Sequence, residues 1–282
     1  MLYPSSNLNK TERSMIKADL NQKNILDWDD DKYYNDVTKV TNSHNKILVD
    51  GGPEALEHYH LYGSEDKPAY AFGRAFHCLV LEKDTFYDKY FVFDDREKCI
   101  EIGGARPTAT NKYKEWLDDI ASENIGKEKL SIGEITILEN MEAKLMSIPQ
   151  VVAMLEASNK EVVYQATIDG VDCKGKIDAV QPNSMVIDLK TTASAPTLSN
   201  FRYDAKRYNY DRQMAFYARL ADVPAACIIA IQKVAPYTVG VYLISEETMK
   251  IGEEKYQYAL GLHKEQFRGN IDLDKFYYQA FL

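Results

Sequence analysis

Apolar residues along the chain follow two patterns, one typical of helices and one typical of buried strands. Between residues 70 and 82, Phe72, Phe76 and Leu79 recur at helical spacing and predict a buried helix. Residues 225–234 form a nearly continuous apolar run, which predicts a central strand buried on both faces. Together with the other segments, these patterns predict an α/β (α+β) fold in which helices flank a mixed central β-sheet.

Turn residues and helix-start signals divide the rest of the chain into elements. Ser131 and Glu134 match a capping box, Thr41 precedes a helix start, and Gly51-Gly52-Pro53 predicts a break after that helix. Residues 94–110 are expected to be a loop. Helices are expected at 53–60, 111–120, 131–147, 149–157, 201–220 and 246–267, and strands at 86–93, 162–168, 171–180, 185–190 and 238–244.

The segment from Glu161 to Lys190 is predicted to fold as consecutive antiparallel strands. Asp169-Gly170 is a strong two-residue hairpin signal between two runs of strand-forming residues. With that turn, Glu161 lies directly opposite Asp178, and their Cβ atoms are roughly 5 Å apart. A second turn at 181–184 returns the chain through residues 185–190, so that Asp178 faces residue 187 or 188.

This arrangement collects charged side chains on one face of the sheet. Because side chains alternate along a strand, Asp188 and Lys190 share a face, and Glu161 and Asp178 join them through the hairpin pairing. Clustered carboxylates repel one another unless a positive charge lies between them, and oxygen-rich clusters suit Mg²⁺ or Mn²⁺. The alternative is a solvated sheet surface on which charges alternate by chance.

Composition narrows the possible classes of protein. The chain has 282 residues and a formal net charge of −9, which disfavours broad, nonspecific binding to nucleic acid. No run approaches the length of a membrane span, and the polar N-terminus does not resemble a signal peptide. The four cysteines have no metal-site spacing, which favours an intracellular, reducing compartment. The chain lacks the G-x4-G-K-[ST] loop of nucleotide-binding proteins.

One predicted helix is basic although the protein is acidic. Residues 201–220 carry five basic and two acidic side chains, which gives a local charge of +3 and a plausible surface for phosphate groups. Arg207 and Arg212 are candidates for these contacts, and Gln213 and Tyr217 share one helix face. The alternative is an exposed amphipathic helix without a ligand.

Four short motifs in order resemble those of the RecE-like phage exonucleases of the PD-(D/E)xK nuclease superfamily. Residues 73–77 look like the helical G-x3-H motif, and Ile177-Asp178 stands where the family has Pro-Asp. Residues 188–190 are similar to (D/E)-x-K, and residues 213–217 match Q-x3-Y. The likeness covers about residues 35–265. Isoleucine replaces the proline before Asp178. Residue 188 is aspartate, the shorter of the two acids that the (D/E)-x-K signature allows.

The resemblance implies a role for each motif. His77, Asp178, Asp188 and the backbone carbonyl of Leu189 would bind Mg²⁺, for which Mn²⁺ could substitute, and Lys190 would orient the attacking water. Gln213 and Tyr217 would support the site or contact the DNA. Glu161 is a further candidate from the strand pairing alone. For His77 the alternative is a core histidine, and the other four histidines have no supporting pattern.

The resemblance also implies an activity and a setting. It implies an ATP-independent exonuclease that digests linear double-stranded DNA, 5′ to 3′, and leaves 3′ single strands for an annealing recombinase. A ring-shaped homo-oligomer, a phage or prophage origin and the cytoplasm of a bacterial host follow from the same likeness, with no membrane association. The alternatives are an endonuclease or repair nuclease, and a non-catalytic module that binds DNA ends. Residues 1–32 are expected to be a flexible arm, and residues 33–282 one nuclease domain that ends in a helix and an apolar tail.

Overall fold

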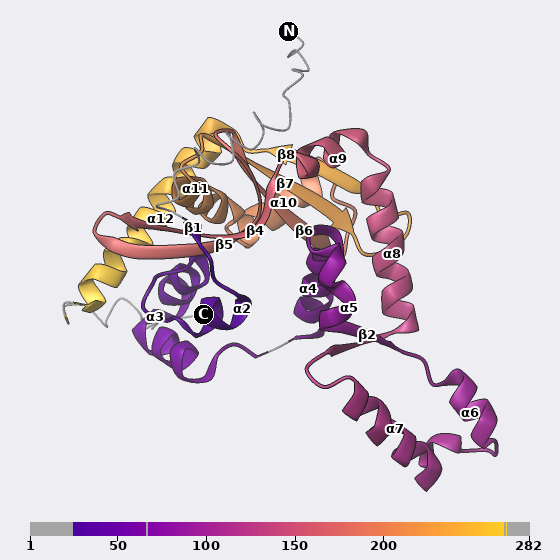
Figure 1. Ribbon diagram of the computed structural model, residues 1–282. Coiled ribbons are helices and arrows are strands. Elements are labelled where there is room, and N and C mark those ends of the chain that lie inside the picture. The colour runs from indigo at the N-terminus through magenta and orange to yellow at the C-terminus, as the bar shows by residue number, and fades with distance from the viewer. Residues whose placement is uncertain (1–24, 66, 268, 270–282) are drawn as a thin grey trace, which may run out of the picture.

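A six-stranded sheet forms the centre of the computed structural model, which describes residues 25–65, 67–267 and 269 (Figure 1). The strand order is β1-β4-β5-β6-β7-β8, and all neighbours are antiparallel except β6 and β7, which are parallel. The predicted mixed sheet flanked by helices is therefore confirmed. The strands are β1 (Ile25–Leu26), β4 (Asn159–Ile168), β5 (Val171–Gln181), β6 (Met185–Thr192), β7 (Ala225–Gln232) and β8 (Val239–Leu243).

Helices cover both faces of this sheet. Helices α4, α8 and α9 pack on one face, and α10, α11 and α12 pack on the other. Among the described helices, none combines the length and hydrophobicity that a membrane crossing requires. The helices are α2 (Asp30–Asn35), α3 (Asn42–Tyr62), α4 (Pro68–Leu81), α5 (Phe86–Lys89), α6 (Arg96–Ile102), α7 (Asn111–Glu123), α8 (Ile132–Met146), α9 (Pro149–Glu156), α10 (Leu198–Arg207), α11 (Tyr210–Ala221) and α12 (Glu246–Phe267).

Strand β7 lies in the middle of the hydrophobic core, as its apolar sequence predicts. Ile228 and its alternate neighbours face the α11–α12 side, whereas Ile229 and its alternate neighbours face the α4–α8 side, and both side chains are buried. Because β6 and β7 are parallel, the connection between them must cross over the sheet. Helices α10 and α11 form this crossover, and α11 packs on the strand that carries Asp188 and Lys190.

Several local predictions of helix starts and breaks are confirmed. Ser131 and Glu134 form the reciprocal capping box: the Glu134 N–H donates to Ser131 Oγ at 3.2 Å and the Ser131 N–H donates to Glu134 Oε2 at 2.9 Å. Thr41 caps α3 through the N–H of His44. The predicted break falls at Gly52, whose φ of 81° kinks the helix before Pro53.

Residues 86–110 differ from the prediction. The segment predicted as a strand begins with α5, because Phe86 turns fully into the core beside α4, and only β2 (Tyr90–Phe93) is extended. The segment predicted as a loop contains α6, built from good helix formers and ended by Gly103 at a φ of 68°, and a 3-10 turn at Pro107–Ala109.

Helices α6 and α7 form an arm that projects from the body of the molecule (Figure 1). The arm is inserted between β2 and β3 (Glu128–Ser131), which pair in parallel as a separate small sheet. All four cysteines are free: Cys78, Cys173 and Cys227 are buried, and Cys99, on the arm, is partly exposed. No disulfide therefore joins the arm to the rest of the domain, and none of the described residues of the hydrophobic core clusters lies on the arm.

The ends of the chain are described only in part. Of the predicted N-terminal arm, residues 1–24 lie outside the described residues, whereas the rest forms β1 and the start of α2. Strand β1 pairs with β4 through Ile25 and Leu26, so this part of the predicted arm is attached to the sheet. The predicted apolar tail, 271–282, also lies outside the described residues, and the domain boundary at residue 33 stays a prediction.

Candidate active site

Polar side chains from separate elements converge where β4, β5 and β6 meet helix α4. His77 on α4, Glu161 on β4 and Asp178 on β5 each offer a ligand atom, and these atoms lie within 4.8 Å of one another. Asp188 and Lys190 on β6 lie beside them, with 2.7 Å between Lys190 Nζ and Asp188 Oδ2. The structure thus brings together the residues that the sequence assigned to one face, and their roles stay predictions.

The predicted register of the first hairpin is confirmed. Ile168 pairs with Val171 next to the turn, and the same register continues to the far end of β4. The pairing is interrupted only at Glu161, whose φ of 53° is left-handed and uncommon for a residue other than glycine. Strained backbone of this kind is concentrated at functional sites. Here the strained residue, Glu161, is one of the three whose ligand atoms converge.

The strands β5 and β6 separate at Asp178. They pair over only three positions next to the second turn, up to Ala179 opposite Ile187. Beyond this point Asp178 Oδ2 accepts the N–H of Leu189 at 2.7 Å, so the carboxylate occupies the place of a backbone partner. The second turn therefore sets Asp178 level with Asp188, one of the two registers predicted from the sequence.

His77 is positioned by α4 and partnered by Asp178. Its Nδ1 lies 3.4 Å from Asp178 Oδ2, and 27% of its side chain is exposed. Burial by itself would lower the pKa of His77, but the charge of Asp178 and a hydrogen bond to it outweigh burial and raise the pKa. Burial opposes the charge on Asp178 in the same way, yet its pKa is lowered by His77.

Asp188 is buried and held between two partners. Gln213 Nε2 donates to Asp188 Oδ1 at 2.8 Å, and the Lys190 ammonium lies on the other oxygen, Oδ2, without a well-aligned hydrogen bond. Burial raises the pKa of Asp188 to about 6, against the pull of Lys190 and with a further rise from Asp178. Burial would lower the pKa of Lys190, but the two carboxylates outweigh it and raise the pKa, so the lysine stays charged.

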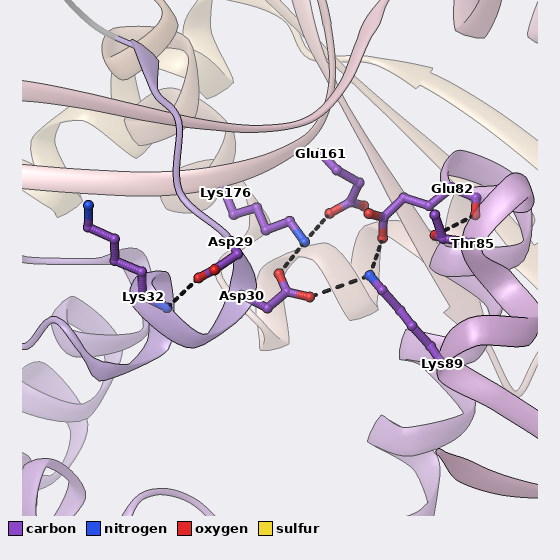
Figure 2. A network of polar contacts seen from close by, with 8 residues as sticks. All are labelled: Asp29, Asp30, Lys32, Glu82, Thr85, Lys89, Glu161 and Lys176. Carbon is purple, nitrogen blue, oxygen red and sulfur yellow. Dashed lines mark hydrogen bonds and ion pairs between the residues drawn. The ribbon is translucent and has the colours of Figure 1, made fainter. Parts of the chain in front are cut away.

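Glu161 is tied to the N-terminal segment by a chain of alternating charges (Figure 2). Lys176 Nζ lies 2.9 Å from Glu161 Oε2 and 2.6 Å from Asp30 Oδ1 on α2. Asp30 also faces Lys89, which in turn bonds Glu82 at the end of α4 at 3.0 Å. Burial, with added repulsion from Asp178, raises the pKa of Glu161 to about 7 despite Lys176.

The sequence interpretation did not include Lys176. A usable sign was present, because Lys176 precedes Asp178 by two positions and so shares its face of β5. Its partner Asp30 could not be predicted, since the pair joins residues 146 positions apart in the chain.

Comparison with protein families identifies the domain. The sequence profile of a PDDEXK-like domain of unknown function (DUF3799) matches residues 53–269. The chain belongs to this PDDEXK-like family. Membership confirms the predicted relationship to the PD-(D/E)xK superfamily, and it covers every residue of the pocket described above. The segment that holds Asp30 precedes the matched region.

One solved structure shares the overall fold of this chain. A candidate exonuclease from Eubacterium rectale matches with a TM-score of 0.60 at 13% identity, over 88% of this chain and 89% of that one. A phage-related exonuclease from Haemophilus somnus 129PT matches with a TM-score of 0.32 at 16% identity, over 59% of this chain and 89% of that one. The second value does not by itself establish a shared fold. Among curated proteins, none matches the chain significantly.

The two residues of the Q-x3-Y motif in this PDDEXK-like domain have different surroundings. Gln213 bonds Asp188, as described above. Tyr217 packs on Gly175 of β5, where an added Cβ would lie 3.1 Å from the tyrosine ring, so the glycine makes room for it. Burial raises the pKa of Tyr217 well above its usual range, and its hydroxyl stays protonated. The motif therefore braces the acidic strands from the α11 side.

The two arginines predicted to contact phosphate differ in exposure. Arg207, at the end of α10, is exposed. Arg212 is 3% exposed, and its Nε donates to Asn42 Oδ1 at 3.3 Å, so the predicted surface position of Arg212 is wrong. The reason is a break at Asn209, which divides the single helix predicted for 201–220 into α10 and α11 and turns Arg212 toward α3.

The donors of the PDDEXK-like pocket fit a hard divalent cation. Carboxylate oxygens and one imidazole are ligands that Mg²⁺ and Mn²⁺ accept, and no cysteine belongs to the group. A buried oxygen of Asp188 lacks an aligned hydrogen bond, and burial, with added repulsion from Asp178, raises the pKa values of Glu161 and Asp188. A bound dication would add positive charge beside these carboxylates.

Proposed function

We propose that this protein is a metal-dependent deoxyribonuclease whose active site is the pocket around Asp178. The observation that carries the proposal is the convergence of His77, Glu161 and Asp178 next to the ion pair of Asp188 and Lys190. Gathering carboxylates in a partly buried pocket is unfavourable, and neither Lys176 nor Lys190 restores an ordinary pKa to Glu161 or Asp188.

The proposed roles follow from these contacts. His77, Asp178 and Asp188, with Glu161 and the Leu189 carbonyl as further candidates, would hold Mg²⁺ or Mn²⁺. When bound, the ion would polarise the scissile phosphate and lower the pKa of a water. Lys190 keeps its proton and its position on Asp188, so it can orient the attacking water or offset charge at the phosphate. Gln213 fixes Asp188 through its amide.

The finer form of the proposal is exonuclease activity on linear double-stranded DNA without ATP. The order of the four motifs and the fold shared with the candidate exonuclease from Eubacterium rectale support it. We propose 5′ to 3′ digestion that leaves 3′ single strands, a ring-shaped homo-oligomer, and hand-over of the strand to an annealing recombinase. A phage or prophage gene expressed in the cytoplasm of a bacterial host would fit this reaction.

One experiment tests both levels of the proposal. Linear duplex labelled at one 5′ or one 3′ end is incubated with Mg²⁺ and, separately, with EDTA. We expect release of the 5′ label first, with Mg²⁺ only. Activity that persists in EDTA would contradict the metal-dependent mechanism, and early release of the 3′ label would reverse the polarity.

A closed circular substrate distinguishes the alternatives. The proposed exonuclease leaves a covalently closed circle intact, whereas an endonuclease or repair nuclease nicks it. A module that only binds DNA ends cuts neither substrate under any metal condition. Intact Asp178, Asp188 and Lys190 argue against that last alternative.

A further inference from the structure

Two tyrosines stand at the turn between α10 and α11, close to the proposed active site. Asn209, between them, has a left-handed φ of 54°. Because of this turn, the rings of Tyr208 and Tyr210 come to lie on the same side, with centroids 5.8 Å apart and planes inclined by 26°. In a continuous helix residues two apart would point to different faces, so the break is what creates the stacked pair.

Helix α12 holds this turn in place. Lys255 Nζ donates to Asn209 Oδ1 at 2.9 Å and to Asp211 Oδ2 at 2.6 Å. Gly252 lies against the same backbone, where an added Cβ would be 2.1 Å from the carbonyl oxygen of Asp211. Only glycine permits this approach of the two helices. The two tyrosines are therefore presented by a rigid support.

A continuous row of cations and rings leads from the proposed active site to the surface. Lys190 Nζ lies 5.1 Å from the centre of the Tyr210 ring, and Arg207 Cζ lies 5.5 Å from the centre of the Tyr208 ring. Exposure rises along the row: Lys190 is 20% exposed, Tyr210 is half-buried, and Tyr208 is 47% exposed. The row connects the lysine of the pocket with solvent.

Packing accounts for the inner ring and not for the outer one. Tyr210 lies 6.0 Å from Phe201, which belongs to the core, so part of its surface serves the fold. Tyr208 has a large exposed face, and the adjoining helix α10 presents Arg202, Lys206 and Arg207 to solvent in a protein of net charge −9. Exposed aromatic rings interleaved with cations are the combination that binds single-stranded nucleic acid through base stacking and phosphate contacts.

We propose that Tyr208 and Tyr210 form a stacking platform for unpaired nucleotides of the strand that enters the active site. In this arrangement a base stacks on the exposed face of Tyr208, Arg207 contacts an adjacent phosphate, and Tyr210 leads the strand toward Lys190. The ligand is a single-stranded DNA end. The inference rests on the proposed nuclease function, because the row ends at the lysine of that site.

The test measures binding apart from cleavage. A single strand of about 12 nucleotides, within the range that single-strand-binding folds cover, carries 2-aminopurine near its end and is titrated with protein in Ca²⁺, which replaces Mg²⁺. Stacking on a tyrosine quenches 2-aminopurine. We expect Tyr208→Leu to weaken binding about 5- to 100-fold and to abolish quenching, the loss expected for one stacked base. Tyr208→Phe keeps the aromatic face and should retain both.

A matched control and a second readout keep the outcomes distinct. Tyr87 is 58% exposed on α5, and Tyr87→Leu should change neither affinity nor quenching. Equal affinity and equal quenching for Tyr208→Leu and the unaltered protein would overturn the platform, even if the protein cuts DNA normally. If no DNA is cut with any metal while Tyr208→Leu still loses binding, the nuclease proposal fails and the platform stands.

Discussion

Histidines occupy two contrasting regions of this protein, the proposed active site and the packing between α3 and α12. His77 faces the carboxylate of Asp178, which raises its pKa although burial opposes the charge. His44 and His263 are 5% and 1% exposed, and burial lowers their pKa values to about 3 and about 4, with a further lowering from His60. The charge of Asp36 does not offset this effect at His44.

The contrast shows what distinguishes a working histidine from a packing one. Burial alone gives a neutral ring that fills space, as at His263, whose Nε2 has no hydrogen-bond partner in the described part of the chain. A partner carboxylate on a neighbouring strand gives a polar pocket that a cation can enter, as at His77. The residue type is the same in both regions, and the difference is whether a carboxylate lies directly against the ring.

The largest effect is expected at the lysine of the pocket. Lys190→Ala should lower the rate of DNA cleavage about 10²- to 10⁴-fold, because a group that positions or protonates at the transition state typically contributes that much. DNA affinity in Ca²⁺ should change little. Single-turnover cleavage of end-labelled duplex measures the loss, and Lys83→Ala, on the surface, serves as the control. Full activity of the variant would remove Lys190 from the mechanism.

Metal dependence should separate the two histidine regions directly. His77→Ala should raise the Mn²⁺ concentration for half-maximal cleavage more than about tenfold, since even an outer partner of a metal ligand usually contributes that much to affinity. His263→Phe should leave the titration unchanged. Calorimetric Mn²⁺ binding gives the same comparison without DNA. An unaltered titration for His77→Ala would return this residue to the packing class.

Acid should destabilise the protein through the interior histidines. Their pKa values in the folded state are depressed, so the stability they contribute is complete above about pH 6.5 and is lost as the pH falls toward about 4. At about pH 5, His263 should account for about 2 kcal/mol of lost unfolding free energy. Urea unfolding across this range measures it. His263→Phe should reduce the pH dependence of the unfolding free energy, whereas His58→Phe, at a surface position, should leave it unchanged. Parallel curves of unfolding free energy against pH for both variants and the unaltered protein would refute the assignment.

The smallest effect is expected in the charge chain of Figure 2. Lys176→Met leaves Glu161 and Asp30 without their shared cation and should cost about 1–2 kcal/mol, because the pair is only partly screened by solvent. Lys83→Met breaks an exposed pair with Glu142 and should cost less than about 1 kcal/mol. Thermal unfolding in EDTA compares the two. Equal losses of stability in the two variants would mean that Lys176, although it lies beside the pocket, contributes no more than a surface lysine.

Local signals in the sequence predicted much of the fold and of the pocket. Asp169-Gly170 set the hairpin register because a two-residue turn leaves no freedom in pairing, and this alone brought Glu161 to Asp178. The alternation of Asp188 and Lys190 on one strand placed both beside them. The capping box at Ser131 and the apolar run of β7 were equally local and equally reliable.

What the sequence did not predict depends on contacts distant in the chain or on weak local preferences. The salt bridge of Lys176 with Asp30 depends on the N-terminal segment, which lies against the edge of the sheet through β1. The break at Asn209 is stabilised by Lys255 on α12, a residue distant in the chain. The residues next to Asn209 by themselves favour one continuous helix, so the break could not be predicted from them. Helix α6 was different, because its helix formers and Gly103 were present in the sequence and were outweighed by nearby turn residues.

The projecting arm carries Cys99, the one partly exposed cysteine, which can be labelled chemically. Of the four thiols, only Cys99 reaches the surface, and partial burial and Asp95 raise its pKa, so it should react more slowly than an unhindered thiol while remaining the one that a reagent can reach. A maleimide dye added to the unmutated chain should therefore label the arm at a single point. Fluorescence from that point would report whether the arm moves when nucleic acid arrives, with no engineered residue anywhere in the protein.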